Sequence, residues 1–359
     1  MDEPNRKAAA RVRLVDVARA AGVSKTTVSD ALNGAGRLPD ATREHVRQVA
    51  RRLGYRPNAT ARRLRAGRSR LLGLAAREFV EHPWFYTELA YFARLTAATT
   101  RAGMTHGYGV VLLPTTGPDD YWTDLPLDGV FVVDPVEGDP LVGDFLAAGV
   151  AVVSDRRAVA GTPWPWVDFD YGAALRGVLD HLEEGGARRV AAVGAPTTAC
   201  YHRDSVQAYL DWNAERGRDP LLAQLDGPGF EPTLAAVESL LSDPEPPDAL
   251  VVLVEISPSL LLDRIRKLGR SVPGDLLLVC ATEDPTAPFT DPPVSTLSFL
   301  PVETADIAVG MLVDLIEGRG VAGGRLLQAR FDVRASSDPR SVPGRAAGFP
   351  GRRPRSSSR

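Results

Sequence analysis

The sequence has little cysteine and little histidine. Only Cys200 and Cys280 are cysteines among 359 residues, so no disulfide framework is expected. Cys280 reads as a small buried apolar residue rather than a sensor. The five histidines lack the spacing of a metal site, and no cofactor-binding motif is present. We therefore expect neither a metal nor a cofactor.

Long hydrophobic runs are also absent. No apolar stretch approaches the ~20 residues that span a bilayer, and the N-terminal MDEPNRKAAARVR lacks the apolar core of a signal peptide. These absences predict a cytoplasmic protein without membrane contact. The G-x-S-x-G, Walker A and H-E-x-x-H motifs are missing as well, which argues against an enzyme.

Charge is divided unevenly along the chain. Residues 1–70 carry 17 Lys and Arg against 6 Asp and Glu, whereas the rest carries 25 against 39. A basic head on an acidic body indicates that the head meets a polyanion such as DNA. The alternative, a merely solvated run of charge, is less favoured because the basic segment also carries a helical hairpin.

That hairpin spans residues 14–33 and predicts two short helices around a tight turn. Gly22 suits the left-handed backbone of the turn, and the Ser24 hydroxyl can cap the second helix. Apolar residues at helical spacing face one another: Val17, Ala18, Ala21, Val28 and Leu32. The outer face of the second helix carries Lys25, Thr26, Thr27, Ser29, Asp30 and Asn33. Such a polar face fits a DNA major groove, although an ordinary helical hairpin would also present one.

Two further segments follow the hairpin. Residues 40–53 predict a third helix, and ATARRLRAG after Asn58 predicts a short basic segment that is too short to be helical alone. Ala61 and Leu64 lie on one side of it, with arginines around them. An apolar wedge flanked by arginines suits a minor groove, whereas a plain linker is the simpler alternative.

The stretches DVARAAGVSKTTVSDALNG, TREHVRQVARRLGYRPNATARRLRAGRS and LLGL resemble the head, hinge and first core strand of the LacI family of transcriptional regulators. The resemblance implies a homodimer on a pseudo-palindromic, double-stranded operator, with Leu64 as the minor-groove wedge. It places Lys25, Thr26 and Asp30 at base-reading positions. It implies DNA contacts at Ser24, Thr27, Ser29, Asn33, Asn58, Ala61 and Leu64. Asp30 departs from the family pattern, because many members carry a basic or otherwise polar residue at this position. Its carboxylate can accept a hydrogen bond from cytosine.

The body, residues 68–335, alternates apolar strands with amphipathic helices. Strands are predicted at 71–76, 107–114, 129–134, 150–155, 190–195, 249–255 and 275–281. Their lack of polar alternation is typical of parallel strands covered on both faces. The fold class is therefore a small all-α helix-turn-helix head plus an α/β body with parallel sheets. By resemblance, the body is two-lobed and periplasmic-binding-protein-like, with a first lobe of 71–166 plus 282–298 and a second of 167–281 plus 299–335.

Candidate effector contacts follow the ends of strands, where ligands of such sheets bind. They are Phe79, Trp84, Phe85, Asp155, Arg203 and Glu283. The resemblance assigns Asp155 to a carboxylate that holds ligand hydroxyls and Arg203 to a ligand-clamping arginine. Asp155 could instead cap a turn, and the aromatic residues could be core packing. Val254-Glu255 and Cys280-Ala281-Thr282 replace polar groups that are common in the family, so the ligand is expected to differ.

The sequence thus predicts a DNA-binding regulator, of the repressor type, that a small-molecule effector controls. A sugar is the commonest effector class of the family. The domains are expected at 1–57 for the head, 58–67 for a hinge helix, 68–335 for the effector-binding and dimerisation body and 336–359 for a disordered tail. The alternative is an α/β enzyme, a hydrolase or sugar kinase, fused to a DNA-binding head.

Overall fold

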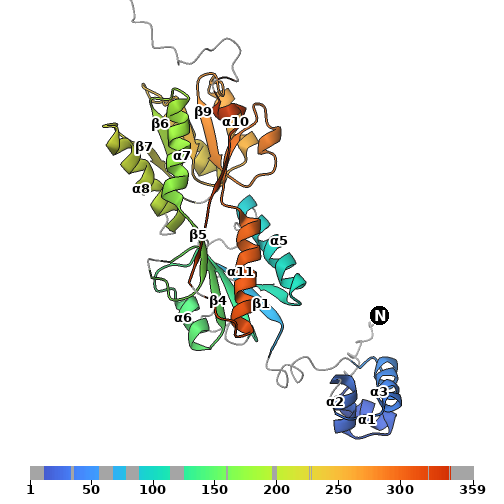
Figure 1. Ribbon diagram of the computed structural model, residues 1–359. Helices are drawn as coiled ribbons and strands as arrows, with labels where there is room; N and C mark the ends of the chain where they lie inside the picture. Colours follow the sequence, from blue (N-terminus) through green and yellow to red (C-terminus); the bar gives the residue numbers. More distant parts are fainter. Residues whose placement is uncertain are drawn as a thin grey trace, which may run out of the picture. The chain divides into compact units, whose positions relative to one another are not determined.

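The chain divides into two compact units between Ser69 and Arg70, called the head and the body here. The computed structural model describes residues 12–33, 36–55, 68–77, 89–113, 125–158, 161–195, 200–225, 227, 229–321, 323–338 and 340. The predicted hinge helix, with Asn58, Ala61 and Leu64, lies outside the described residues. Figure 1 shows the three helices of the head and the two sheets of the body.

The head consists of α1 (Leu14–Ala21), α2 (Lys25–Asn33) and α3 (Asp40–Arg52). The predicted hairpin and third helix are confirmed. Gly22 ends α1 with φ 65°, the left-handed conformation that glycine adopts at little cost. The helices share one small core made of Val17, Ala18, Ala21, Val28, Ala31, Val46, Val49 and Ala50.

The first lobe of the body is built on a six-stranded parallel sheet in the order β11-β5-β4-β3-β1-β2. Its strands are β1 (Leu71–Ala76), β2 (Gly109–Leu112), β3 (Gly129–Val133), β4 (Ala151–Asp155), β5 (Trp166–Phe169) and β11 (Arg325–Leu327). Helices α5 (Ala90–Thr105) and α11 (Pro301–Ile316) pack together on one face, and α6 (Pro140–Ala147) covers the other. Because β3 and β4 are covered on both faces, nearly all of their residues are buried.

The second lobe holds a six-stranded sheet in the order β12-β10-β9-β8-β6-β7, parallel except for the β10–β12 pair. Its strands are β6 (Val190–Gly194), β7 (Leu221–Gln224), β8 (Ala249–Val252), β9 (Leu277–Ala281), β10 (Ser295–Ser298) and β12 (Arg330–Asp332). Its helices are α7 (Tyr171–Glu184), α8 (Cys200–Glu215), α9 (Phe230–Leu241) and α10 (Pro258–Lys267). Cys280 is fully buried in β9, as expected of a small apolar residue.

The predicted division between the lobes is wrong after residue 281. Strand β10 was expected in the first lobe, but it pairs with β9 and β12 in the second sheet. Helix α11 was expected in the second lobe, but it packs on β3, β4 and β5 of the first. The chain crosses between lobes at 169–171, 298–301 and 327–330. The apolar face of α11, with Ala305, Ala308 and Leu312 buried, is what brings the chain back to the first sheet.

The body also extends further than expected. Ser336 and Ser337 were assigned to the disordered tail, yet both are fully buried in the 3-10 helix η3 (Ala335–Ser337). The Ser336 hydroxyl donates to the Leu278 carbonyl at 2.7 Å, and the Ser337 and Ser295 hydroxyls lie 2.7 Å apart. These hydrogen bonds fasten the segment to the second sheet. Among the described helices, none is long and apolar enough to cross a membrane.

Candidate DNA-binding surface and effector site

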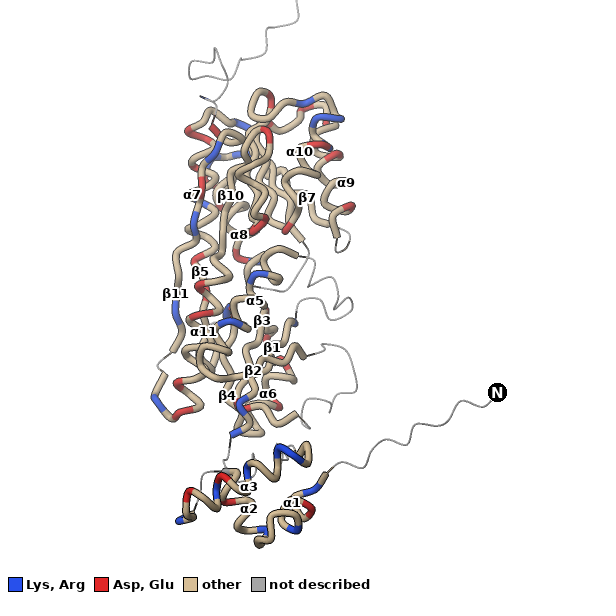
Figure 2. The backbone as a smooth tube through the Cα atoms, turned by 90° about the vertical axis from the view of Figure 1, so that its right-hand side faces the viewer, with Lys and Arg blue, Asp and Glu red and all other residues tan. Residues whose placement is uncertain are grey.

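The start of α2 is fixed by local hydrogen bonds. The Ser24 hydroxyl accepts the Thr27 backbone N–H at 3.0 Å, which confirms the predicted cap, and lies 2.8 Å from the Thr27 hydroxyl. This pairing uses both hydroxyls inside the turn, while Lys25 and Thr26 stay exposed between them. A rigid first turn therefore presents Lys25 and Thr26 outward. Basic residues lie on all three head helices (Figure 2).

One of the predicted DNA-contact residues, Ser29, lies elsewhere than expected, and a second, Asp30, has a contact within the head. Ser29 was assigned to the outer face of the second helix but is buried, with 7% of its surface exposed. The Asp30 carboxylate packs against the loop after α2, where a Cβ on Gly36 would meet its Oδ2 atom at 3.0 Å. Arg43 of α3 donates to the Asp30 carbonyl at 3.4 Å and to the Gly36 carbonyl at 3.3 Å. The backbone of Asn33 closes α2, and its side chain lies outside the described residues.

In the body, two buried carboxylates lie at the carboxyl ends of neighbouring strands of the first sheet. Asp155 ends β4 and Asp134 follows β3, and they are 0% and 2% exposed. The Tyr91 hydroxyl donates to Asp155 Oδ2 at 2.9 Å. Burial raises the pKa of Asp155 to about 7, an effect that Arg156 opposes and Asp134 reinforces. Within the described part of the chain, neither Asp155 Oδ1 nor Asp134 Oδ2 accepts a hydrogen bond.

Arg156 occupies the space between these carboxylates and the aromatic residues around them. Its guanidinium pairs with Asp134, and its Nε donates to the Tyr171 hydroxyl at 2.9 Å. It also lies over the Tyr91 ring at 5.0 Å and over the Tyr201 ring at 5.3 Å. Because Tyr201 belongs to α8 of the second lobe, this one side chain connects both lobes.

The second lobe contributes its own carboxylates at the ends of β8 and β9. The Thr282 hydroxyl donates to the Glu255 carboxylate, which also accepts the Glu283 backbone N–H at 3.2 Å. Burial raises the pKa of Glu255 to about 7. A hydrogen bond from the Tyr91 backbone N–H, at the first turn of α5, acts in the opposite direction. Arg94 of α5 donates to the Glu283 carbonyl at 3.1 Å and pairs with the Glu283 carboxylate at 3.7 Å, so both Tyr91 and Arg94 join α5 to the second lobe.

The Glu283 carboxylate is also hydrogen-bonded within the second lobe. Its Oε1 atom accepts the Ser298 hydroxyl at 2.6 Å and the Phe299 backbone N–H at 3.1 Å. Burial raises the pKa of Glu283 above its usual range, while these hydrogen bonds and Arg94 lower it. The carboxyl ends of both sheets thus meet across a polar, largely buried layer, which we call the interlobe cluster. It consists of Tyr91, Asp134, Asp155, Arg156, Tyr171, Tyr201, Glu255, Thr282 and Glu283.

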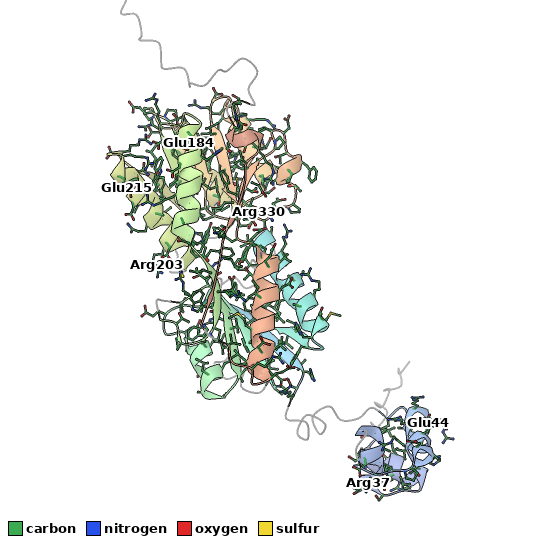
Figure 3. The ribbon with its side chains drawn as sticks, in the orientation of Figure 1. Arg37, Glu44, Glu184, Arg203, Glu215 and Arg330 are labelled. Atoms are coloured by element: carbon green, nitrogen blue, oxygen red, sulfur yellow. The ribbon has the colours of Figure 1, made fainter. Side chains whose placement is uncertain are left out.

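Asp155 and Glu283 are the predicted effector residues that the structure places in the interlobe cluster. Arg203 is not among its members: its side chain is 53% exposed, and its Nε donates to Asp204 at 3.0 Å. Figure 3 shows Arg203 on the outside of the body at the start of α8. The remaining candidates, Phe79, Trp84 and Phe85, lie outside the described residues. Among the residues that the structure describes, no group of His, Cys, Asp and Glu could hold a metal ion.

Sequence reasoning missed the residues that complete the cluster. Tyr171 and Tyr201 each lie in the first turn of a helix that follows a strand, the position at which parallel sheets bind ligands. That signal could have found both tyrosines. Glu255 was noted as a departure from the family pattern, but its contact with Thr282 joins the ends of two strands and is visible only in the fold.

The ionisation of Asp155 predicts a pH-dependent stability. Native Asp155 holds its proton up to a pKa of about 7, whereas the unfolded chain releases it near 4. The native state therefore binds more protons in between, and the free energy of unfolding falls as pH rises from about 4 to about 7. Asp155→Asn cannot lose a proton at this position, so its free energy of unfolding should not show this fall. Measured by urea unfolding, the free energy of unfolding of the variant minus that of the wild type should therefore be larger at pH 8 than at pH 5. An equal difference at both pH values would contradict the assignment.

Comparisons with known proteins agree with this architecture. The model of bacterial regulatory proteins of the lacI family matches residues 13–58, and a periplasmic binding protein-like domain matches residues 179–337. The HTH-type transcriptional regulator RafR of Escherichia coli is 30% identical over 248 residues, covering 67% of this chain and 72% of RafR. The repressor CytR of Escherichia coli K12 is 26% identical over 336 residues, covering 90% of this chain and 95% of CytR.

Solved structures show the same fold. The Lac repressor dimer bound to operator and the anti-inducer ONPF matches with a TM-score of 0.77 at 21% identity, covering 91% of this chain and 99% of that one. The complex of the regulator CelR with cellobiose matches with a TM-score of 0.64 at 26% identity, covering 91% of this chain and all of that one.

A helix-turn-helix head joined to a two-lobed α/β body defines a DNA-binding transcriptional regulator. The chain belongs to the LacI family of bacterial regulators. The enzyme alternative finds no support, because the relatives named here are transcriptional regulators and repressors.

Proposed function

We propose that the protein represses transcription as a homodimer on a pseudo-palindromic operator, and that a small sugar-like effector held between its lobes controls this binding. Two relatives support the proposal: CelR has been solved with cellobiose, and the Lac repressor as a dimer on its operator. Binding to bacterial DNA implies that the protein acts in the cytoplasm. The mechanism is linkage, in which effector binding changes the lobe arrangement and the paired heads lose simultaneous contact with DNA.

The observation that carries the effector half of the proposal is the pair of open carboxylate oxygens, Asp155 Oδ1 and Asp134 Oδ2. Both groups are buried at the carboxyl ends of parallel strands, and such oxygens need donors. Sugar hydroxyls supply them, since each hydroxyl can donate one hydrogen bond. Asp155 is therefore the proposed anchor of the effector, and Glu283 is the proposed contact from the second lobe. Arg203, which pairs with Asp204, is proposed only as an outer contact.

On the DNA side, we assign base reading to Lys25 and Thr26, whose side chains are exposed on the first turn of α2. Ser24, Thr27 and Asn33 remain proposed contacts to phosphates or neighbouring bases. Asp30 packs against Gly36, so it shapes the loop after α2 in addition to any contact with cytosine. The proposed hinge contacts are Asn58, Ala61 and Leu64.

Leu64→Ala tests the hinge. If Leu64 enters a base step of the operator, the variant should bind operator DNA about tenfold more weakly while nonspecific DNA binding stays nearly unchanged, because unstacking and wedge contacts occur only on the specific site. Fluorescence anisotropy with operator and scrambled duplexes at one fixed salt concentration measures both affinities. Leu146→Ala, at an exposed position of α6, is the matched control and should change neither. Equal losses on both duplexes would exclude the wedge.

A genome-wide map of bound sites tests the proposed function as a whole. Aligned sites should give a pseudo-palindrome, and the genes beside them should indicate the effector class. Sugars chosen on that basis are then added to the purified full-length protein. The effector should raise the melting temperature of the wild type and leave Asp155→Ala unaffected. Binding to fragments without any sequence preference would overturn the proposal.

A further inference from the structure

We propose that the Arg156 side chain fills the position of a ligand among the other residues of the interlobe cluster. In that position it holds the two lobes together when no effector is present. The inference rests on the effector site proposed above and adds a specificity-determining residue to it. Arg156 is 5% exposed, and its guanidinium contacts a carboxylate, a tyrosine hydroxyl and two aromatic rings of the cluster.

The contacts of Arg156 are those of a bound organic cation. Asp134 supplies the counter-charge, and the Tyr171 hydroxyl accepts from Nε at 2.9 Å. The Tyr91 and Tyr201 rings lie 5.0 and 5.3 Å from the guanidinium carbon. A planar cation near two aromatic faces and one carboxylate is the arrangement by which proteins recognise ammonium and guanidinium ligands.

These groups come from both lobes. Asp134 and Tyr91 belong to the first lobe, together with Arg156 itself. Tyr171 and Tyr201 lie in the first turns of α7 and α8 of the second lobe. A buried ion pair confined to one lobe would stabilise that lobe only, whereas Arg156 loses two of its four partners when the lobes separate. Its contacts therefore favour the closed arrangement.

The backbone at this point carries strain. Arg156 has φ 75° and Asp134 has φ 52°, and both lie in the left-handed region that residues other than glycine adopt at a cost of roughly 1 kcal/mol or more. Adjacent carboxyl ends of β3 and β4 thus both depart from extended geometry. The two residues with positive φ are also the two that form the buried ion pair.

This arrangement restricts the effector. While Arg156 lies over the Tyr91 and Tyr201 rings, an effector cannot stack on the ring faces that the guanidinium covers. Within the interlobe cluster, the buried side-chain acceptors that have no hydrogen-bond partner among the described residues are Asp155 Oδ1 and Asp134 Oδ2. The effector that leaves Arg156 in place is therefore one rich in hydroxyl or amine donors rather than one that binds through an aromatic ring.

Chemical rescue of the full-length Arg156→Ala variant tests the inference, with no DNA or effector present. Small-angle X-ray scattering should show a larger radius of gyration than in the wild type, and the melting temperature should fall by about 5 °C or more, because Asp134 is left buried without a partner. Methylguanidinium at 10 mM should restore at least half of both changes. The same concentration of urea, which is planar but uncharged, should restore neither.

Arg157→Ala is the matched control, because Arg157 also pairs with an aspartate, Asp168, and lies 5.0 Å from an aromatic ring, that of Trp166, but within the first lobe. It should lower the melting temperature without changing the radius of gyration. Arg156→Lys keeps the charge but cannot lie flat between two rings, so it should also open the lobes. It serves as the second variant if the alanine variant does not fold.

An unchanged radius of gyration in both Arg156 variants, or an absence of rescue by methylguanidinium, would overturn the inference. Either result leaves the proposed function standing, because that function depends on operator binding and on Asp155. If the protein did not bind an operator, the rescue experiment would still test the role of Arg156, because it uses neither DNA nor effector.

Discussion

Lys25→Ala is expected to weaken binding to the operator by about 1–3 kcal/mol, or roughly 5- to 150-fold, because one side-chain contact to a base edge has that value. Thr26→Ala should show a smaller loss of the same kind. Both side chains are exposed on the turn that Ser24 and Thr27 fix, so neither variant should disturb the head core. Titration of operator and scrambled duplexes by fluorescence anisotropy gives the specific and nonspecific affinities.

Arg51→Ala provides the charge-matched control for Lys25. Arg51 lies in the last turn of α3 and is exposed, so its loss should reduce attraction to all DNA alike. The ratio of specific to nonspecific affinity should fall for Lys25→Ala and stay constant for Arg51→Ala. If both variants leave that ratio constant, α2 does not read bases through Lys25.

Phe299→Ala is expected to destabilise the body by about 3–5 kcal/mol, the usual cost of removing a buried aromatic ring. Phe299 lies at the second crossing between the lobes and is 5% exposed. Its ring centroid lies 5.4 Å from that of Phe169, 5.2 Å from that of Tyr171 and 5.0 Å from that of Tyr201, all in tilted or edge contacts. The cavity would open where two of the three crossing segments meet, so the surrounding chain has little freedom to collapse into it.

Chemical denaturation followed by circular dichroism measures this loss. Phe289→Ala is the matched control, because the Phe289 side chain is 87% exposed and the same substitution there should change stability by less than about 0.5 kcal/mol. Similar values for the two variants would show that the aromatic cluster at the crossing does not stabilise the body.

The elements with a strong and regular pattern could be predicted from the sequence. Continuous apolar runs such as 71–76 and 129–133 become buried strands, and Gly22 with Ser24 defines the turn of the hairpin. Five strands were missed, and all of them are only three or four residues long: β5, β7, β10, β11 and β12. Two of these are also mostly polar, since β10 is Ser-Thr-Leu-Ser and β12 is Arg-Phe-Asp. The residues of β10 are held by tertiary partners: the Ser295 backbone N–H donates to the Ser336 hydroxyl, and the Ser295 hydroxyl donates to the Arg334 carbonyl.

The candidate site could be predicted only in part, for a physical reason. Asp155 and Glu283 follow strands, and that position alone identifies them. The role of Arg156 depends on the Tyr91 and Tyr201 rings, which lie 65 residues before it and 45 residues after it in the chain. No local pattern encodes a contact of that range, and the exposed position of Arg203 likewise depends on how α8 is rotated against β6.

The three crossings have a consequence for synthesis of the chain on the ribosome. The head is complete once residue 55 has emerged, but the first lobe lacks α11 until residue 316 and its edge strand β11 until residue 327. The second lobe likewise waits for β12 and for Ser336 and Ser337. A nascent chain thus carries a finished DNA-reading head long before either lobe can close its sheet. The apolar residues of β3 and β4 that α11 covers stay open to chaperones until translation is nearly over.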